Sequence, residues 1–314
     1  MRYIKDLKEG ERVSCVYLSK HRISATTRNG KTYESLILQD KTGQVDGKIW
    51  EPDSPAIEDT SDLDYVAVNG EVVIYNSQPQ LNIKRIRKAS EDEYDPADYL
   101  PVSERNIDEM YNEVLSLSNT VKEPHLNALL KGFFVEDSEF ITKLKRGSAA
   151  KSVHQAFVGG LLEHTINVAR ICEFLSTRYK DLDHDLLLTA ALLHDIGKTE
   201  ELSPFPENDY TDSGNMMGHI VIGTMMIDRK IDRIPDFPKL LKTELEHCIL
   251  AHHGELEYGS PKVPAIIEAV ALNFADNTDA KLTIFSEALS AAPGDMKWLG
   301  FNKLLSGNIR RTEV

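Results

Sequence analysis

The sequence predicts a multi-domain chain with an N-terminal all-β barrel followed by a C-terminal all-α domain. Residues 1–88 contain short stretches of alternating apolar and polar residues separated by turn residues, which is typical of strands. From about residue 103, apolar residues recur with the 3.6-residue period of amphipathic helices. The length of 314 residues agrees with about two domains.

Charge separates the same two parts of the chain. Residues 1–88 contain 14 Lys and Arg against 13 Asp and Glu, whereas the remaining residues contain 22 against 37, which gives the whole chain a net charge of -14. Lys and Arg supply most of the non-specific affinity of proteins for nucleic acid, so the overall acidity argues against such a partner. This argument does not apply to the N-terminal segment, because the negative net charge comes from the C-terminal part.

Five short strands are expected in residues 1–88. The first begins near Val13, and Asn29-Gly30 is a residue pair favoured in two-residue hairpin turns. Another turn is expected at 40–43. The later strands are expected at 33–39, 44–50, 65–75 and 79–88. Five strands joined by turns would form a small barrel.

The segment 34–50, ESLILQDKTGQVDGKIW, resembles the nucleic-acid-binding OB-fold of the anticodon-binding type. OB-folds bind single strands by stacking bases on aromatic rings within a positively charged groove. The resemblance therefore implies that residues 1–88 form a nucleic-acid-binding domain. The alternative interpretation places the aromatic residues in the barrel core and the basic run 84–88 at a solvated strand end. The candidate contacts are Arg28, Tyr33, Lys48, Trp50, Tyr75, Lys84, Arg85 and Arg87.

Residues 89–150 are interpreted as an acidic linker and connecting helices. The segment 89–100 is acidic and contains a proline, and Ser103 is expected to cap a helix. Helical patterns follow at 107–117, 125–134 and 138–144. A basic stretch that includes Arg146 and His154 would line an entry path for a nucleic-acid strand, although its composition slightly favours a solvated helix end.

The remaining residues, 151–314, contain the pair His194-Asp195 in the run ALLHDIGK. Imidazole binds transition metals, and a carboxylate can bridge two metal ions. The apolar run before the pair predicts a buried helix that ends near Gly197. A single histidine on an apolar face is usually a core residue, but five of the ten histidines occupy such positions together. The candidate metal ligands are His164, His194, Asp195, His219, His252, His253 and Asp276.

The order His164, His194-Asp195, Asp276 resembles the HD-domain superfamily of metal-dependent phosphohydrolases, and the segment 159–165, GGLLEHT, strengthens this resemblance. In that family a first metal ion is held by the residues that match these four positions. The resemblance thus implies that residues 151–314 form an HD domain with phosphohydrolase activity, followed by a C-terminal tail.

The intervening histidines are similar to those of binuclear members of the superfamily. A second metal ion would share Asp195 and take His219 together with His252 or His253, and the sequence leaves open which of the two. Asp195 would then be catalytic. Lys198 would pair with a substrate phosphate, unless it only complements a helix dipole.

Over nearly its whole length the chain resembles the YhaM-type 3'-5' exoribonucleases of Gram-positive bacteria. The resemblance implies removal of nucleoside 5'-monophosphates from the 3' end of single-stranded RNA, with single-stranded DNA as a second substrate. It implies two divalent metal ions, with Mn²⁺ first and Fe, Ni, Co or Zn as alternatives. It also implies a homo-oligomer.

Three alternative functions remain open. Cyclic-dinucleotide phosphodiesterases also use a His-His pair, but their pair is followed by Gly-Tyr-Pro, and Tyr258-Gly259-Ser260-Pro261 departs from it. A hydrolase of free nucleotides would not explain the barrel. A nucleic-acid-binding regulator with a relic HD domain is disfavoured by the complete ligand set.

Other features of the sequence fit a cytoplasmic protein without a membrane partner. No apolar run is long enough to span a bilayer, and the N-terminus lacks the features of a signal peptide. Cys15, Cys172 and Cys248 are widely separated, which favours reduced thiols over a disulfide framework.

Overall fold

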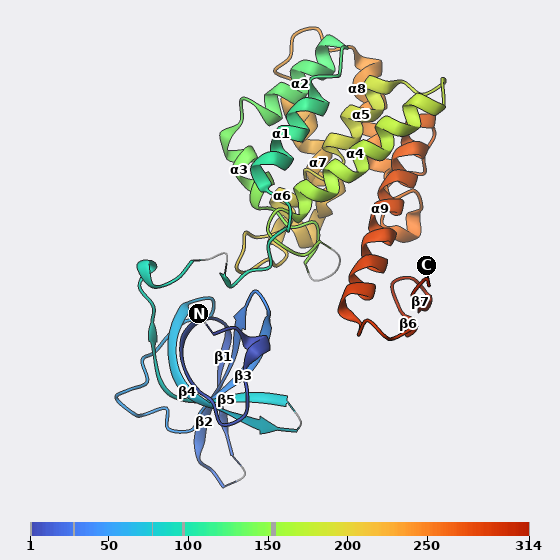
Figure 1. Cartoon of the computed structure of the whole chain (residues 1–314). Helices are drawn as coiled ribbons and strands as arrows, with labels where there is room; N and C mark the ends of the chain where they lie inside the picture. Colours follow the sequence, from blue (N-terminus) through green and yellow to red (C-terminus); the bar gives the residue numbers. More distant parts are fainter. Residues whose placement is uncertain (1, 28, 77, 96–97, 152–154, 314) are drawn as a thin grey trace. The chain divides into compact units, whose positions relative to one another are not determined.

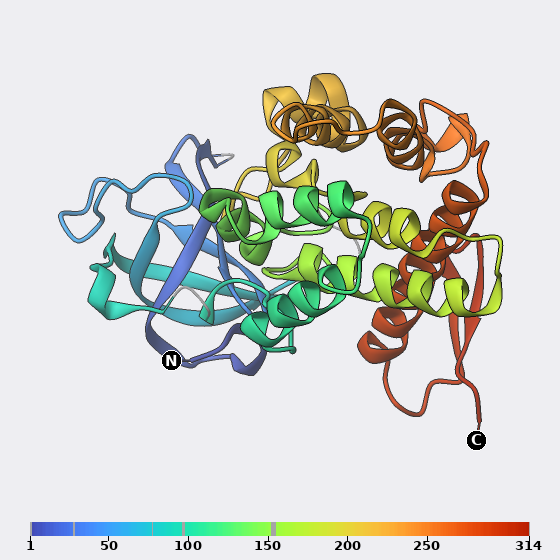
Figure 2. The same ribbon diagram turned by 90° about the horizontal axis from the view of Figure 1, so that it is seen from above.

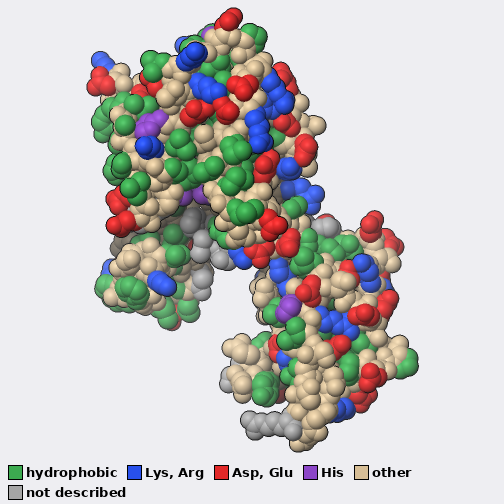
Figure 3. All heavy atoms as spheres, turned by 180° about the vertical axis from the view of Figure 1, so that it is seen from behind, with side chains coloured by type: hydrophobic (Ala, Val, Ile, Leu, Met, Phe, Trp, Pro, Cys, Tyr) green, Lys and Arg blue, Asp and Glu red, His purple; other side chains and the backbone are tan. Residues whose placement is uncertain are grey.

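The computed structural model describes the chain except for residues 1, 28, 77, 96–97, 152–154 and 314. It divides into two compact units, residues 1–102 and 103–314 (Figure 1). The predicted fold class is confirmed, because the first unit is a β-barrel and the second is helical apart from a small C-terminal hairpin. Figure 3 shows acidic and basic side chains interspersed over one face of each unit.

Within the described part of the first unit, five strands close into a barrel in the order β1-β2-β3-β5-β4. Neighbouring strands are antiparallel except for the parallel pair β3 and β5. This is the five-stranded Greek-key arrangement of the OB-fold. Each strand lies where the alternating pattern predicts one. The strands are β1 (Arg12–Thr26), β2 (Thr32–Asp40), β3 (Gly43–Ile49), β4 (Tyr65–Tyr75) and β5 (Gln78–Lys88).

Alternation along the strands places one side chain in two inside the barrel, where Tyr17, Leu36 and Leu38 are fully buried. A short 3-10 helix, η1 (Ile4–Asp6), adds Ile4 to the same core. The hairpin between β1 and β2 is longer than the predicted two-residue turn. Strand pairing stops at Thr26 and Thr32, so the connection spans 27–31.

Residues 89–102 belong to the compact unit of the barrel. They contain a 3-10 helix, η2 (Glu91–Glu93), and the ring of Tyr94 stacks on Tyr65 with centroids 3.9 Å apart. Tyr99 packs edge-on against the Tyr65 ring, with centroids 5.2 Å apart. This acidic segment therefore packs on the barrel through aromatic rings.

The second unit consists of helices around one apolar core, and Figure 2 gives a second view of it. The predicted helices at 107–117, 125–134 and 138–144 are present. The predicted cap is wrong, because Asn106 accepts from the backbone N–H groups of Asp108 and Glu109, whereas Ser103 donates to Glu163. The elements are α1 (Ile107–Ser118), α2 (Pro124–Phe134), α3 (Ser138–Arg146), α4 (Gly160–Arg178), α5 (His184–Leu193), α6 (Lys198–Glu201), α7 (Asp212–Ile231), α8 (Lys239–Ala251), η4 (Leu256–Tyr258), α9 (Ile267–Ala291), β6 (Trp298–Asn302) and β7 (Gly307–Arg310).

Helix α5 lies at the centre of this unit and contacts α4, α8 and α9. Residues 186–193 of α5 are all buried, because they are apolar or small on every side of the helix. The chain segment that follows α5 is thereby held inside the unit. No helix among the described residues is long and apolar enough to cross a membrane.

Candidate functional site

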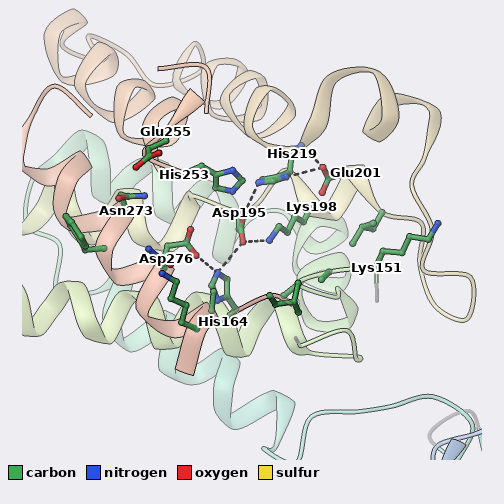
Figure 4. A pocket seen from close by; sticks show the side chains of 18 of the residues that line it. Lys151, His164, Asp195, Lys198, Glu201, His219, His253, Glu255, Asn273 and Asp276 are labelled. Atoms are coloured by element: carbon green, nitrogen blue, oxygen red, sulfur yellow. Dashed lines mark hydrogen bonds and ion pairs between the residues drawn. The ribbon is translucent and has the colours of Figure 1, made fainter. Parts of the chain in front are cut away.

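Asp195 lies at the centre of the site, two residues after the end of the buried helix α5. Its carboxylate is 3% exposed, and its two oxygens face different groups of histidines (Figure 4). The Oδ2 atom lies 3.4 Å from Nε2 of both His164 and His194. The Oδ1 atom lies 3.4 Å from Nε2 of His219 and 3.8 Å from Nε2 of His252. Asp195 is therefore positioned to bridge two ligand sets.

The predicted ligands come together as two clusters on either side of Asp195. In each cluster, one potential ligand atom per residue lies within 4.8 Å of the others. Helices α4, α7 and α9 and the segments that follow α5 and α8 supply these side chains. One cluster contains His164, His194 and Asp276, and the other contains His219, His252 and His253. Both members of the His252-His253 pair thus face the same place.

The distances between ligand atoms fit divalent cations. His164 Nε2 lies 3.2 Å from His194 Nε2 and 3.1 Å from Asp276 Oδ1. Two atoms bound to one ion at about 2.1 Å, at angles of 90–109°, are about 3.0–3.4 Å apart. A cluster with this spacing needs no rearrangement of the backbone to hold an ion.

Unpaired buried atoms give a second indication of metal binding. Among the described residues, Asp195 Oδ1, His219 Nε2 and His252 Nε2 are buried and have no hydrogen-bond partner. Leaving such atoms without a partner costs on the order of 1–3 kcal/mol each. All three point at the same place, so one cation would satisfy them together.

Hydrogen bonds outside the clusters orient four of the five histidine rings so that Nε2 faces Asp195. Ligand histidines in metalloproteins are held through their other nitrogen in this way, which fixes the tautomer and the ring orientation. Carboxylates hold two of these rings: His164 Nδ1 lies 2.7 Å from Asp279, and His219 Nδ1 lies 3.0 Å from Glu201. Backbone carbonyls hold the other two: His194 Nδ1 lies 2.8 Å from the Ala191 oxygen, and His252 Nδ1 lies 2.7 Å from the Ile249 oxygen.

Glu201 and Asp279 were not predicted from the sequence. Asp279 follows Asp276 by three residues on α9, so helical spacing could have indicated that the two carboxylates share a face. Glu201 contacts His219 only through the tertiary fold and leaves no signal in the sequence. It accepts from both the backbone N–H and Nδ1 of His219, at 2.9 and 3.0 Å.

Two glycines explain how His219 reaches the site. Gly218 has φ +73°, which interrupts α7 and starts a new helical segment at His219. Gly197 was predicted to end a helix, but α5 already ends at Leu193, and Gly197 has helical φ -60°. A Cβ atom at Gly197 would lie 2.0 Å from the His219 carbonyl oxygen. Its absence allows α6 and α7 to approach closely.

The clustered charges shift the proton equilibria of the site. Burial opposes the charged form of His164, but three nearby aspartates outweigh it and raise the pKa of His164 well above its usual value. Burial would raise the pKa values of Asp195 and Asp276, but the cationic partners lower both, chiefly Lys198 for Asp195 and His164 for Asp276. In the metal-free protein a proton on His164 thus holds the first cluster together.

Lys198 reaches Asp195 from the side of the cavity. Its Nζ lies 2.7 Å from Asp195 Oδ2, and its side chain is 16% exposed. Burial lowers the pKa of Lys198, but the Asp195 carboxylate outweighs burial, so the pKa lies above its usual value. The side chain is therefore cationic and lies beside the clusters.

The two clusters open into a cavity of about 770 Å³ (Figure 4). This volume is within the range of about 300–1,000 Å³ that is usual for sites that bind small organic ligands. The lining residues that the structure describes all belong to the second unit, and they include Lys151, Tyr210, Asn273 and Phe274.

On the barrel, the structure brings three of the predicted nucleic-acid contacts together. The rings of Tyr33 and Trp50 stack with centroids 5.1 Å apart, and Lys48 Nζ lies 5.9 Å from the Tyr33 ring centroid. Trp50 is 37% exposed and donates from Nε1 to Asn82. These side chains are on the outer surface of β2 and β3 and not in the core.

The other predicted contacts are separate from this aromatic pair. Tyr75 is 62% exposed at the end of β4. Arg85 and Arg87 line a different groove with residues of β1 and β4, and Glu93 holds Arg87 through two hydrogen bonds. Lys84 is exposed on β5, and Arg146 ends α3 in the second unit. Arg28 and His154 lie outside the described residues.

The Glu201→Gln substitution is expected to weaken metal binding at the second cluster about 10- to 100-fold. The neutral amide of the substituted side chain would replace the charged carboxylate that accepts a hydrogen bond from His219 Nδ1–H. Calorimetric titration of the metal-free protein with Mn²⁺ measures the effect. The neighbouring Glu200→Gln is the matched control, because Glu200 is exposed. Equal Mn²⁺ affinity of the two variants would show that Glu201 does not position His219.

Mn²⁺ binding is expected to tighten as the pH rises from 6 to 8. His164 must lose its Nε2 proton to bind a cation, so the affinity should rise about tenfold per pH unit below its raised pKa. The same proton stabilises the metal-free fold. That contribution is complete below about pH 6.5 and is lost as the pH rises through the folded-state pKa. Titrations and melting curves at pH 6, 7 and 8 measure both trends, and a pH-independent affinity would contradict this account.

Comparison with known proteins assigns part of the second unit to a protein family. Residues 161–281 match the family model of the HD domain. This range includes every residue of the two clusters and Asp195.

Solved structures similar to this chain contain OB-folds. The second OB-fold domain of replication protein A from Methanococcus maripaludis is 18% identical, with 29% of this chain and 95% of that chain covered and a TM-score of 0.23. The OB domain of a Thermoplasma acidophilum protein is 15% identical, with coverage of 31% and 92% and a TM-score of 0.23. A replication protein A heterotrimer bound to single-stranded DNA is 16% identical, with coverage of 28% and 64% and a TM-score of 0.22.

Proposed function

We propose that this chain, which joins an OB-fold barrel to an HD domain, is a metal-dependent 3'-5' exoribonuclease that releases nucleoside 5'-monophosphates from single-stranded RNA. The observation that carries the proposal is the position of Asp195 between two clusters of ligand atoms inside a cavity. This arrangement supports hydrolysis of a phosphate ester. The polymer substrate, the 3'-5' direction and the preference for Mn²⁺ rest on the resemblance of the sequence to exoribonucleases of this architecture.

Different residues of the site would have different roles in this reaction. Two divalent cations, when bound, would lower the pKa of a water molecule and stabilise charge on the phosphate and the leaving oxygen. Asp195 would hold both cations, and Glu201 and Asp279, which accept hydrogen bonds from His219 and His164, would keep these two rings oriented. Lys198 would bind a phosphate oxygen through its ammonium group.

The barrel would hold the RNA strand. The half-buried ring of Tyr33 and the exposed ring of Trp50 offer an aromatic surface for bases. Lys48 lies beside the Tyr33 ring but pairs with Asp46, so it would have to exchange partners to bind the backbone. Stacking of this kind contributes about 1–3 kcal/mol per base and tolerates any base. The barrel would therefore favour single strands without a strong sequence preference.

A hydrolase of free nucleotides is the second candidate, because the described residues that line the cavity all belong to the second unit. A substrate panel separates the two functions. The full-length protein with Mn²⁺ would be incubated with single-stranded RNA, nucleoside triphosphates or cyclic dinucleotides, and the products would be separated by chromatography. We expect 5'-monophosphates from RNA at a much higher rate than from the other substrates. Preferential hydrolysis of a free nucleotide would replace the proposed function.

A further inference from the structure

Helix α9 extends the cavity wall beyond the metal ligand that it supplies. Besides Asp276, the cavity is lined by Asn273, Phe274, Asn277 and Lys281 from this helix. Their spacing of three, four and seven residues places them along one side of α9. Phe274 and Lys281 are two helical turns apart, about 10 Å along the helix axis. The cavity thus continues from the metal clusters along a helix surface.

Phe274 exposes an aromatic ring on this surface. Its side chain is 62% exposed although it lines the cavity. A planar apolar ring that water reaches at a cavity wall is a platform on which a nucleic-acid base can stack.

Lys281 supplies a cation that no acidic side chain holds among the described residues. The two other lysines that line the cavity are engaged, since Lys198 pairs with Asp195 and Lys151 with Asp209. Lys281 is exposed two turns beyond Phe274. An unengaged ammonium group at this position suits a phosphate of a nucleic-acid backbone.

The C-terminal hairpin also lines this cavity. The loop between β6 and β7 contributes Leu304, Leu305 and Ser306. Arg311 ties the hairpin to α9 by donating from Nη2 to the Leu289 carbonyl at 2.7 Å. The cavity is therefore bounded by α9 and by a loop that α9 itself anchors.

We propose that Phe274 and Lys281 bind the end of a nucleic-acid strand, Phe274 by stacking on a base and Lys281 by pairing with a backbone phosphate. This inference rests on the proposed function, because it needs a polymer substrate at the same site. Stacking on a ring accepts every base, so the two residues would select for a strand and not for a sequence.

Kinetics of full-length variants on a single-stranded RNA oligonucleotide test the inference. Phe274→Ala is expected to raise KM about 5- to 100-fold with little change in kcat, and Phe274→Tyr to retain the wild-type KM. Lys281→Ala should raise KM and reduce the salt dependence of RNA binding by about 0.7 in the slope of log K against log salt.

Phe285→Ala is the matched control, because Phe285 is an exposed phenylalanine on the same side of α9 but does not line the cavity. It should behave as the wild type. A wild-type KM for Phe274→Ala would overturn the inference and leave the proposed function standing. A fall in molar mass in both Phe274→Ala and Phe285→Ala, measured by light scattering, would overturn the inference and identify this side of α9 as a self-association face. Failure of the wild type itself to degrade RNA would overturn the proposed function and this inference together.

Discussion

The Asp195→Asn variant is expected to lose about 10³-fold or more in hydrolytic rate. Both oxygens of Asp195 face ligand clusters, so the amide removes the shared charge and presents an N–H donor to one of them. If the metal ions stabilise the transition state by several kcal/mol, losing this stabilisation lowers the rate by three or more powers of ten. Steady-state hydrolysis of RNA with saturating Mn²⁺ measures the change.

The fold of this variant is expected to survive, because asparagine has the size of aspartate. Mn²⁺ should raise the Tm of the wild type, in which it binds only the folded state, and should raise the Tm of Asp195→Asn much less. Asp181→Asn is the control, since Asp181 is exposed and away from the clusters. Wild-type activity in Asp195→Asn would remove this residue from the reaction.

The Gly197→Ala substitution is expected to destabilise the fold by about 3 kcal/mol and to reduce activity with it. The added Cβ would lie 2.0 Å from the His219 carbonyl oxygen and 2.7 Å from the Gly223 N atom, and real Cβ contacts essentially never fall below 3.0 Å. Both contacts are to backbone, so α6 and α7 would have to separate, which costs energy of the order seen for overpacked cores. His219 would move with α7, and the second cluster would open.

Denaturation with urea measures this effect. Gly294→Ala is the matched control, because Gly294 has no atom within 4 Å of the added Cβ and does not have a left-handed φ. Its stability should stay within about 0.5 kcal/mol of the wild type. Equal unfolding midpoints for the two variants would show that α6 and α7 can separate at little cost.

The strands of the barrel were predictable because alternation and turn residues act over short distances. Each of the strands β1 to β5 lies where the pattern predicts it. The C-terminal hairpin formed by β6 and β7 was interpreted only as a tail, since its short strands carry no clear alternation. The predicted cap at Ser103 failed because the hydroxyl found a tertiary partner in Glu163, and Asn106 took over the helix end.

The candidate ligands could be identified from the sequence because each is a His or Asp in a helical pattern with a known order. Their supporting contacts could not. Glu201 contacts His219 across 18 residues, and this contact depends on the close approach that Gly197 permits. The sequence also could not show how much of the positive charge in the basic run 84–88 is free to bind a phosphate. Glu93, which lies in a segment interpreted as a linker, pairs with Arg87.

The most direct test of the proposed function follows a 5'-end-labelled single-stranded RNA on a sequencing gel. The purified full-length protein with Mn²⁺ should produce a ladder that shortens from the 3' end and ends in short oligonucleotides. The ladder should be absent with EDTA and with Asp195→Asn. Release of labelled 5'-mononucleotide at the earliest times would reverse the direction, and intact RNA across Mn²⁺, Fe²⁺, Ni²⁺, Co²⁺ and Zn²⁺ would contradict the assignment as an exoribonuclease.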